Sequence, residues 1–329
     1  MKILITGNLG LLGVWTSNYL LDKGYSVVGI DDCSGGNIDY LDNRIKFYKR
    51  DIVLGIDDIF EIEKPDIVIH YAAYAAECLS DYIKSFNYNN NIIASVNIIN
   101  ACINHNVHKI IFTSSMCVMG ENEVPFTEDQ IPQPIDSYGI AKLTIENELK
   151  ISYKKFGLNY SILRPHNIIA NSCQAFWDPY RNVLSIWGSN IINGKDINVY
   201  GDGLSERSFS DVKFMLSMVE KLFYGFNGEI FNIGSDQPIT ILEAARKMQG
   251  IANKLGYSPE IKHLQPRTEV KYAYSNHSKI INMLGFKDET NLDQIMEDLL
   301  QWIKSQPNTK YRFMDYEVNK NMYDYWVKK

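Results

Sequence analysis

The chain has 329 residues, of which 45% are hydrophobic and 22% charged, and its formal net charge is -6. This length and apolar content allow one large domain, or two closely joined domains, with a sizeable core. A negative balance without a lysine- or arginine-rich run argues against a nucleic-acid-binding surface. The chain enters a predicted strand at residue 2 without a leader-like segment, and no run of about 18 apolar residues occurs. We therefore expect a cytoplasmic protein with no membrane partner.

The cysteines and histidines indicate neither disulfides nor a metal. The cysteine number is odd, the positions are scattered and no Cys-x-x-Cys pair occurs, which predicts free thiols in a reducing compartment. The six histidines show no metal-ligand spacing, so we expect no bound metal. The cysteines are Cys33, Cys78, Cys102, Cys117 and Cys173.

The first strong motif is a glycine-rich turn between a short apolar strand and a helix. Residues 2–6 predict a buried strand, and Gly7, Gly10 and Gly13 follow at once at Gly-x-x-Gly-x-x-Gly spacing, opening a helical pattern that runs to about Lys23. Backbone amides of such a turn, at the start of a helix, can hold a pyrophosphate. The motif therefore predicts a dinucleotide site.

A second predicted strand, residues 25–30, ends in Asp31-Asp32. A carboxylate at this distance from the glycine turn is placed to hydrogen-bond an adenosine ribose, and it would repel a 2′-phosphate. The expected cofactor is therefore NAD rather than NADP. Asp31 is the better candidate for the ribose contact. Asp32 is the second candidate, and the alternative interpretation is that it serves only the turn.

Strands and helices alternate along the first half of the chain, as a doubly wound parallel sheet requires. The rhythm breaks after Arg164, where a helix near 181–193 and short strands near 197–200 are predicted. A late strand at 229–234 is expected to return to the sheet. We therefore expect an α/β, Rossmann-like NAD-binding domain over 1–165 and a smaller, interleaved substrate-binding domain over 166–329. The other predicted elements are strands at 45–51, 66–73, 109–115 and 161–165, with long helices at 88–105 and 137–156.

The catalytic candidates are Ser115, Tyr138 and Lys142. Ser115 ends an apolar strand, and the other two stand four residues apart on a predicted helix. An i,i+4 pair projects from one face, so the ammonium can lie beside the phenol and favour its ionised form. A Tyr-x-x-x-Lys pair alone is weak evidence, and its weight here comes from the glycine turn upstream.

Together these motifs resemble the extended short-chain dehydrogenase/reductase family, and within it the nucleotide-sugar epimerases of the UDP-galactose 4-epimerase type. The resemblance covers nearly the whole chain. The segments that carry it are Thr6 to Gly13, Asp31, Arg50-Asp51-Ile52, His70 to Ala73, Thr113 to Ser115, Tyr138 to Lys142, Arg164 to Asn167, Asp178 to Asn182, Tyr200 to Gly203 with Arg207, and Arg267 to Lys271.

The resemblance implies an NAD-dependent epimerase that inverts a hexose, with C4 of a UDP-hexose the expected centre. Tyr138 would take a proton from a sugar hydroxyl, Ser115 would hydrogen-bond that oxygen, and Lys142 would also hold the nicotinamide ribose. Hydride would pass to NAD, leaving a transient 4-keto sugar, and would return to its other face. The family also implies a homodimer formed through the helices at 88–105 and 137–156.

The same resemblance assigns the binding residues. The expected cofactor set is Gly7, Gly10, Leu11, Leu12, Gly13, Asp31, Asp32, Asp51, Ile52, Tyr71, Ala72, Ala73, Asn90, Tyr138, Lys142 and His166. The expected substrate set is Ser115, Asn167, Asn182, Arg207, Arg267 and Ala273. Among these, the asparagines and arginines would contact the nucleotide diphosphate. Ala273 would leave room for an N-acetyl group at the sugar's C2, with Tyr272 or Tyr274 as alternatives for that position.

Two departures and several alternatives accompany this interpretation. Met119 stands where relatives often carry a tyrosine, and the segment 168–173 lacks the usual glycine. A 4,6-dehydratase is disfavoured because Met116-Cys117 occupy the positions of an Asp-Glu pair, and neither can act as a carboxylic acid. A reductase or dehydrogenase, a decarboxylase, and a non-catalytic NAD-binding regulatory protein remain as alternatives.

Overall fold

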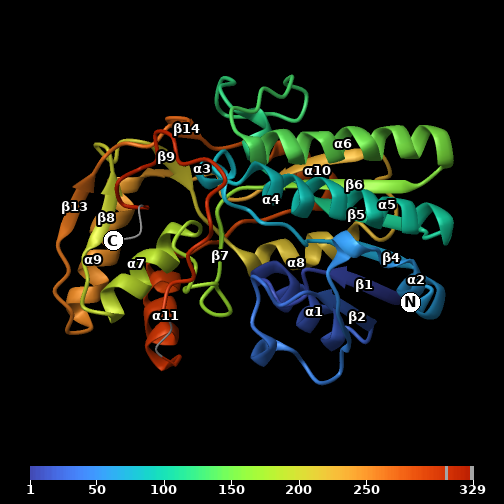
Figure 1. The fold of residues 1–329 in the computed structure, drawn as a ribbon, viewed down its shortest axis with the longest axis horizontal. Helices are drawn as coiled ribbons and strands as arrows, with labels where there is room; N and C mark the ends of the chain where they lie inside the picture. The colour runs from blue at the N-terminus through green and yellow to red at the C-terminus, as the bar shows by residue number, and fades with distance from the viewer. Residues whose placement is uncertain (308–309, 327–329) are drawn as a thin grey trace.

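A computed structural model describes residues 1–307 and 310–326. Its centre is a seven-stranded parallel sheet in the order β11-β6-β5-β4-β1-β2-β3 (Figure 1). This confirms the predicted α/β class with a doubly wound parallel sheet. The strands are β1 (Lys2–Thr6), β2 (Ser26–Asp31), β3 (Lys46–Lys49), β4 (Ile67–His70), β5 (Lys109–Thr113), β6 (Asn159–Pro165) and β11 (Glu229–Ile233).

The strand order reverses between β1 and β4. The chain builds β1, β2 and β3 toward one edge, and then returns to place β4, β5, β6 and β11 toward the other. At such a switch point the loops leave the carboxyl ends of the strands in opposite directions and open a crevice, which is where ligands bind in open α/β sheets. The topology therefore places the glycine turn after β1 directly at the crevice.

Apolar residues cover both faces of the sheet because its central strands are buried on both sides. Leu4 faces a cluster that includes Ile98 and Ile145, whereas Ile3 faces a cluster that includes Leu20 and Met215. The alternation along β1 thus holds α2 (Asp57–Glu63), α5 (Ala94–Asn104) and α6 (Ser137–Phe156) on one face. It holds α1 (Leu11–Asp22), α8 (Val212–Lys221) and α10 (Ser278–Leu284) on the other.

The helix predicted at 88–105 is divided in the structure. It consists of α4 (Lys84–Tyr88), a π-helical turn over Asn89–Ile93 and α5. The π turn coincides with a run of asparagines whose side chains bond backbone groups, since Asn91 donates to the carbonyl of Tyr74 at 3.1 Å and accepts its N–H at 2.9 Å. Such local bonds compete with regular helix geometry. Shorter helical segments are α3 (Glu77–Ser80) and the 3₁₀ turns Ile38–Tyr40, Ile52–Leu54 and Met116–Met119.

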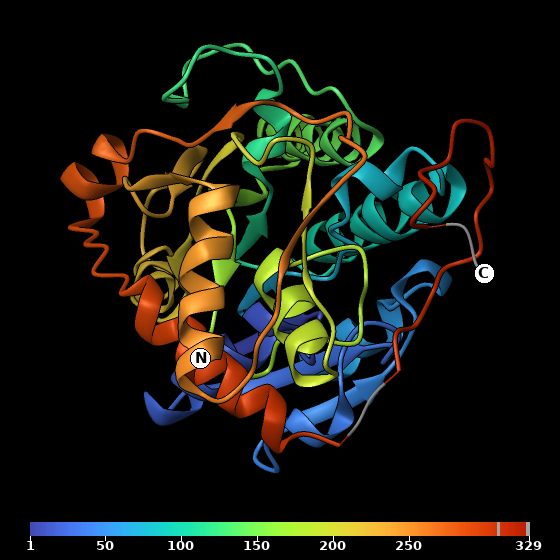
Figure 2. The ribbon, with the colours of Figure 1, turned by 90° about the vertical axis from the view of Figure 1, so that its left-hand side faces the viewer.

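The remainder of the chain forms a second part (Figure 2). This part has its own apolar core around Trp187 and Met248. However, β11, α8 and α10 belong to the first sheet and its cover, so the two parts interleave, and a division near residue 165 stays a proposal. The elements of the second part are β7 (Ile168–Ile169) with β10 (Ser210–Asp211), β8 (Ile197–Tyr200) with β13 (Ile261–Leu264), β9 (Glu206–Ser208) with β12 (Pro238–Thr240) and β14 (Tyr272–Ala273), α7 (Val183–Ile192), α9 (Ile241–Lys254) and α11 (Leu292–Ser305).

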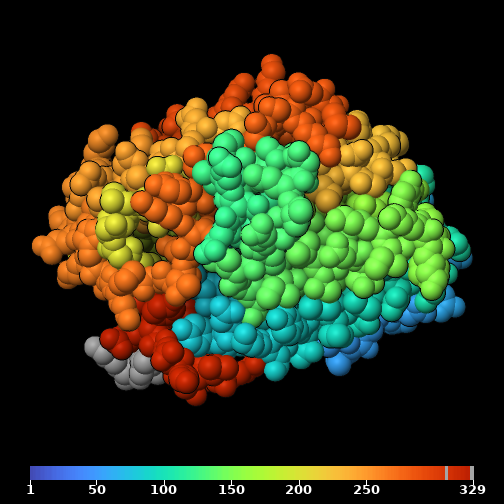
Figure 3. Space-filling model, turned by 90° about the horizontal axis from the view of Figure 1, so that it is seen from above, coloured from blue at the N-terminus to red at the C-terminus, as the bar shows by residue number. Residues whose placement is uncertain are grey.

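The C-terminal segment 310–326 has no regular structure and lies against the chain around α3 and α4 (Figure 3). Its Tyr323 and Trp326 pack with Ile83 and Tyr180 in a small aromatic cluster. Within the described part of the chain, no helix is both long and apolar enough to cross a membrane.

A buried ion pair ties α6 to the sheet. Glu146 on α6 and Arg164 on β6 are 0% and 1% exposed, and their side chains meet at 2.6 and 2.8 Å. Ser114, which follows β5, donates its hydroxyl to the same carboxylate at 2.6 Å. The hydrogen bonds that Arg164 and Ser114 donate to the Glu146 carboxylate offset the cost of removing the two charges from water.

We expect Glu146→Ala to lower the free energy of unfolding by about 3–5 kcal/mol, because it leaves the Arg164 guanidinium buried without its partner. Urea unfolding followed by circular dichroism measures the loss. Glu148→Ala, an exposed position on the same helix, is the matched control and should stay close to wild type. Equal effects of the two substitutions would contradict a structural role for the pair.

Candidate active site

Two adjoining cavities lie at the carboxyl ends of the strands. The larger is about 380 Å³ and the smaller about 110 Å³, and they share Gly7, Gly10, Tyr71, Ala73 and Arg181 in their walls. Together they form one cleft that runs across the switch point of the sheet. Of the predicted residues, the larger cavity brings together Gly7, Gly10, Leu11, Leu12, Gly13, Tyr71, Ala73, Ser115, Tyr138, Lys142, Asn167, Asn182, Arg207 and Arg267. The smaller one adds Asp31, Asp32, Asp51, Ile52, Ala72 and Asn90.

The glycine turn has the close packing that a bound pyrophosphate needs. Gly7 adopts φ +68°, and a Cβ there would stand 2.7 Å from the backbone nitrogen of Ala72. A Cβ on Gly13 would lie 2.2 Å from the carbonyl oxygen of Gly7. α1 begins without a side-chain cap at Gly10, so its first amides remain available on the cavity side. The turn therefore fits an anionic group at the start of α1.

Asp31 lies at the wall of the smaller cavity, where it is 9% exposed. Its carboxylate accepts the N–H groups of Leu9 at 3.0 Å and Cys33 at 2.8 Å, which fix its orientation. Burial raises the pKa of Asp31, opposed by these two amides. Asp32 instead accepts the amide and hydroxyl of Ser34 at 2.8 and 2.6 Å, which are the bonds of a turn residue. Asp31 is thus the carboxylate placed for a ribose hydroxyl.

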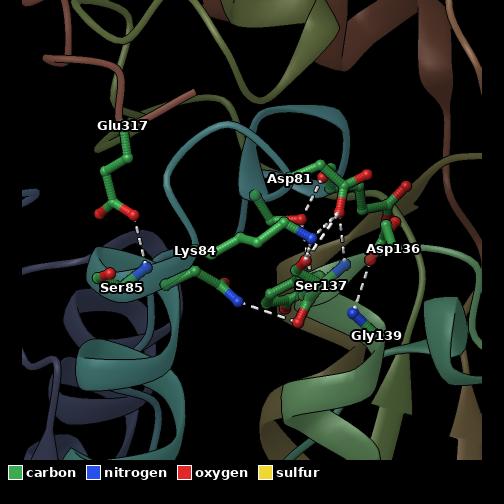
Figure 4. A network of polar contacts seen from close by, with 11 residues as sticks. Asp81, Lys84, Ser85, Asp136, Ser137, Gly139 and Glu317 are labelled. Atoms are coloured by element: carbon green, nitrogen blue, oxygen red, sulfur yellow. Dashed lines mark hydrogen bonds and ion pairs between the residues drawn. The ribbon is translucent and has the colours of Figure 1, made fainter. Parts of the chain in front are cut away.

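The start of α6 is held by a polar network (Figure 4). Asp136 caps the helix by accepting the N–H of Gly139 at 2.7 Å, and Asp81 accepts the amide and hydroxyl of Ser137 at 3.0 and 2.7 Å. The N–H of Tyr138 donates to the hydroxyl of Ser80 at 3.0 Å. A hydrogen bond therefore joins α3 to α6 at Tyr138, the candidate base.

Tyr138 and Lys142 are both buried in the wall of the larger cavity. The Lys142 ammonium donates to the carbonyl of Thr113 at 2.8 Å and lies 5.6 Å from the centre of the Tyr138 ring. Ser115 stands beside the phenol, where its hydrogen bond lowers the pKa of Tyr138. The serine, tyrosine and lysine are thus brought together, from β5 and α6.

The sequence predicts that Lys142 favours the ionised form of Tyr138 together with the positive charge of the nicotinamide, and the surroundings of the phenol show why that second charge is needed. Burial raises the pKa of Tyr138 well above its usual range, and the nearby Cys117, Glu77 and Asp136 raise it further. Burial also lowers the pKa of Lys142 to about 8. The protein by itself therefore holds the phenol protonated, and a base function requires an additional positive charge in the cavity.

The predicted arginines lie on the far wall of the same cavity. The Arg207 guanidinium donates to the carbonyls of Glu206 and Val270 at 2.8 and 2.9 Å. The Arg267 guanidinium lies 3.5 Å from the centre of the Tyr200 ring, and its buried Nη2 has no hydrogen-bond partner among the described residues. A buried guanidinium with a free donor is suited to a phosphate oxygen.

Two predicted site residues do not line either cavity. His166 is buried in a chain of side chains, where its Nε2 lies 3.0 Å from that of His277, which in turn bonds Asp236. Burial lowers the pKa of His166 to about 3. Ala273 packs in an apolar cluster with Met116 and other residues. Neither residue therefore belongs to the lining of these two cavities, and their expected contacts with the cofactor and the sugar stay predictions; the alternatives Tyr272 and Tyr274 also lie outside the lining.

Several residues that line the larger cavity were not predicted from the sequence as site residues, among them Glu77, Arg181 and Glu269. Arg181 borders both cavities, bonds Asp178 at 2.7 Å and stacks over Tyr74 at 4.8 Å. These residues lie on loops and short turns, whose sequences carry no periodic pattern. Arg181 was within reach, because it stands next to the predicted Asn182.

Because its pKa is about 8 in the folded protein and 10.5 ordinarily, Lys142 binds fewer protons in the native state than in the unfolded state between these values. This penalty is full below pH 8 and disappears as the pH rises toward 10.5. We expect Lys142→Met to raise the free energy of unfolding at pH 7.5 by up to about 3 kcal/mol, reduced by the contribution of the hydrogen bond that the substitution removes. At pH 10 the gain should be smaller. Urea unfolding at both pH values tests this, with the exposed Lys154→Met as control; a pH-independent difference between variant and wild type would contradict it.

Comparisons with known proteins agree with this geometry. The model of the NAD dependent epimerase/dehydratase family matches residues 3–234. A putative UDP-glucose 4-epimerase of Methanocaldococcus jannaschii is 26% identical over 312 residues, which are 93% of this chain and 100% of that protein. The structure of a Thermotoga maritima UDP-glucose 4-epimerase with UDP-glucose superposes with a TM-score of 0.85 at 28% identity, covering 92% of this chain and 99% of that one. The structure of a Bacillus cereus UDP-glucuronic acid 4-epimerase in complex with UDP-glucuronic acid and NAD superposes with a TM-score of 0.82 at 27% identity, covering 92% of this chain and 99% of that one. The family match spans well over half of the sequence, and the chain belongs to the NAD dependent epimerase/dehydratase family.

Proposed function

We propose that the protein is an NAD-dependent nucleotide-sugar epimerase that inverts C4 of a UDP-hexose. The observation that carries this proposal is that one cavity contains Ser115, Tyr138 and Lys142 together with the glycine turn and two arginines. A redox centre and a diphosphate site thus share one space. The relatives named above, which include UDP-glucose and UDP-glucuronic acid 4-epimerases, support the same reaction.

The glycine turn would hold the NAD pyrophosphate, Asp31 the adenosine ribose, and Lys142 the nicotinamide ribose. NAD, when bound, supplies the hydride acceptor that makes a transient 4-keto sugar reachable. Tyr138 accepts the proton of the sugar hydroxyl and later returns it to the same oxygen. Ser115 hydrogen-bonds that oxygen and holds it against the phenol. Because the phenol is otherwise protonated, the positive charge of the oxidised nicotinamide is what allows it to act as a base.

The substrate diphosphate would lie against the arginines on the opposite wall. The unpaired Nη2 of Arg267 offers a donor, and the guanidinium is held in place by Tyr200 and by Tyr325, whose hydroxyl lies 3.1 Å from its Nε. Asn167 and Asn182 line the same wall, both in left-handed backbone conformations at φ +39° and +61°. Such strained asparagines often mark a binding function.

Alternative reactions on this scaffold are distinguished by their products. A 4,6-dehydratase needs an acid beside the catalytic serine, and Met116 and Cys117 occupy those positions in the 3₁₀ turn. A reductase or dehydrogenase would consume cofactor in proportion to product, and a decarboxylase would release carbon dioxide. A regulatory protein would bind NAD without turnover. An epimerase requires no added reductant, since the hydride removed is returned.

We expect the purified protein to interconvert UDP-glucose and UDP-galactose with NAD alone, and Tyr138→Phe to lower turnover by about two to four decades through loss of the general base. Chromatographic separation of the epimers after incubation measures the rate. Unchanged fold and NAD binding in the variant are the controls. Retention of more than about a tenth of the wild-type rate would refute the role of Tyr138, and absence of any epimerised nucleotide sugar from a UDP-, GDP-, CDP- and dTDP-sugar panel would refute the proposed function.

We also propose a homodimer formed through the outer surface of α5 and α6. Ile140 and Ile151 on α6 are 45% and 52% exposed, and about three helical turns separate them, so they share one face. Apolar side chains repeated along one exposed helix face favour burial against a second copy, and two-fold dimers are the commonest assembly.

A cytoplasmic location remains an expectation from the scattered cysteines.

We expect sedimentation at micromolar concentration to give a dimer, and Ile151→Glu to shift it toward monomer by placing a charge in the contact. The matched control is Ile131→Glu, because Ile131 is 78% exposed and lies on the loop before α6, outside both helices. A monomeric wild-type protein would exclude this assembly.

A further inference from the structure

We propose that Glu77 sets the charge preference of the sugar site, so that the cavity takes nucleotide sugars with a neutral hexose and discriminates against hexuronic acids. This inference rests on the proposed function and extends it to the substrate class. Glu77 was not expected from the sequence, and it belongs to none of the motifs that define the cofactor site.

The position of Glu77 is fixed against the catalytic tyrosine. Glu77 begins α3, and its carbonyl accepts the hydroxyl of Ser80 at 2.6 Å. The oxygen of that same hydroxyl accepts the N–H of Tyr138 at 3.0 Å. One side chain therefore links the backbone of Glu77 to the backbone of the candidate base. This link fixes α3 beside the first turn of α6.

The carboxylate of Glu77 faces the cavity. It lines the same space as Ser115, Tyr138 and Arg207, and its side chain remains accessible from within that space although protein surrounds it. Its carboxylate makes no hydrogen bond or ion pair with another side chain in the described ranges 1–307 and 310–326. Because this carboxylate lines the cavity without a protein partner, it is available to accept hydrogen bonds from a ligand there.

Glu77 lines one cavity together with both ends of the proposed substrate site, Tyr138 at the reacting end and Arg207 at the diphosphate end. Its charge acts on the phenol of Tyr138 at the reacting end, and the charge of Arg207 at the diphosphate end acts on Glu77. A hexose whose C4 hydroxyl meets Tyr138 and whose diphosphate meets the arginines spans this interval. The Glu77 carboxylate is therefore within the region that the sugar ring and its substituents occupy.

The charged groups closest to Glu77 are mainly negative. Asp136 and Glu269 are negative neighbours, whereas Arg207 already pairs with Glu269 at 3.2 Å and donates to backbone carbonyls. Neutral sugar hydroxyls can donate to the Glu77 carboxylate. A sugar carboxylate would instead add a further negative charge to an enclosed, acidic region, which is the kind of repulsion that gives specificity.

The charge of Glu77 also predicts how this preference changes with pH. Burial and the neighbouring Asp136 raise the pKa of Glu77 to about 7, against the effect of Arg207. Two other groups near Glu77 titrate in the same interval: burial raises the pKa of Asp136 to about 6 and lowers that of Lys142 to about 8, so both change the charge in the same direction as Glu77 when the pH rises. Burial also raises the pKa of Tyr138 and of the thiols of Cys78 and Cys117. Their raised pKa values keep the phenol and both thiols neutral between pH 6 and 8. Glu77 therefore becomes more negative over this interval, and discrimination against a uronic acid should increase with it.

The test compares UDP-glucose with UDP-glucuronate, measured as dissociation constants by calorimetry on the NAD-loaded protein and as kcat/KM. We expect the wild type to favour UDP-glucose by on the order of 100-fold at pH 8 and by less at pH 6. Glu77→Gln should reduce the ratio at least tenfold, mainly through tighter binding of UDP-glucuronate, and should reduce its pH dependence to the part that Asp136 and Lys142 contribute. Glu121→Gln, which makes the same change at an exposed position outside the cavity, should leave the ratio unchanged.

The two hypotheses fail in different ways. If UDP-glucose is epimerised but the ratio is the same in Glu77→Gln and wild type, or if wild type takes both sugars equally, the role of Glu77 is wrong and the proposed function stands. If no nucleotide sugar is bound or turned over, both are wrong. Should Glu77→Gln fail to fold, a wild-type ratio that stays constant between pH 6 and 8 overturns the inference by itself.

Discussion

The buried ion pair between Glu146 and Arg164 is the constraint on which the rest of the site depends. It joins α6 to β6, and the hydroxyl of Ser114 adds the end of β5 to the same carboxylate. These three elements carry Tyr138 and Lys142, the loop with Asn167, and Ser115. Because an ion pair with 0% and 1% exposure keeps its charges only if every partner stays in place, small rearrangements are penalised. The reactive groups are thereby held in one arrangement before a ligand binds.

A second set of contacts connects the two sides of the cavity. Glu317 of the C-terminal segment accepts the amides of Ser85 and Phe86 at the start of α4, at 2.7 and 2.9 Å. Farther along, the hydroxyl of Tyr323 accepts the N–H of Thr268 at 2.9 Å, beside Arg267. The segment thus spans from the helices that cover the sheet to the arginine wall. A segment without regular structure thereby contributes to the shape of the site.

The electrostatics of the cavity explain how one space serves both an oxidation and the binding of a diphosphate. At the reacting end, burial holds the Tyr138 phenol protonated and lowers the pKa of the Lys142 ammonium. At the opposite end, Arg267 keeps its charge against aromatic rings. Glu77 lines the same cavity and adds a negative charge. This charge takes part neither in the proposed hydride transfer nor in the binding of the diphosphate. The proposed preference for a neutral sugar therefore rests on a residue that belongs to neither end of the cavity.

The sequence by itself determined the class of fold, and it predicted the glycine turn and the trio of Ser115, Tyr138 and Lys142, which line one cavity. Residues 2–6, 137–156 and 197–200 form the predicted elements, because apolar periodicity and the glycine turn are local signals that tertiary contacts did not override. The strand order was not local, but alternating strands and helices leave few topologies, and right-handed crossovers select among them.

Only the tertiary structure decided what lies beside those residues. His166 and Ala273 lie in the expected segments, yet the side chain of one turns toward His277 and that of the other toward Met116, since nearby strands and loops offer these partners. The raised pKa of Tyr138 likewise depends on burial and on neighbours far along the chain. Glu77 has no motif, and its position near Tyr138 arises from one serine that joins two helices. Motifs fix which groups are present, whereas burial and the packing of distant segments fix where each side chain points and which charge it carries.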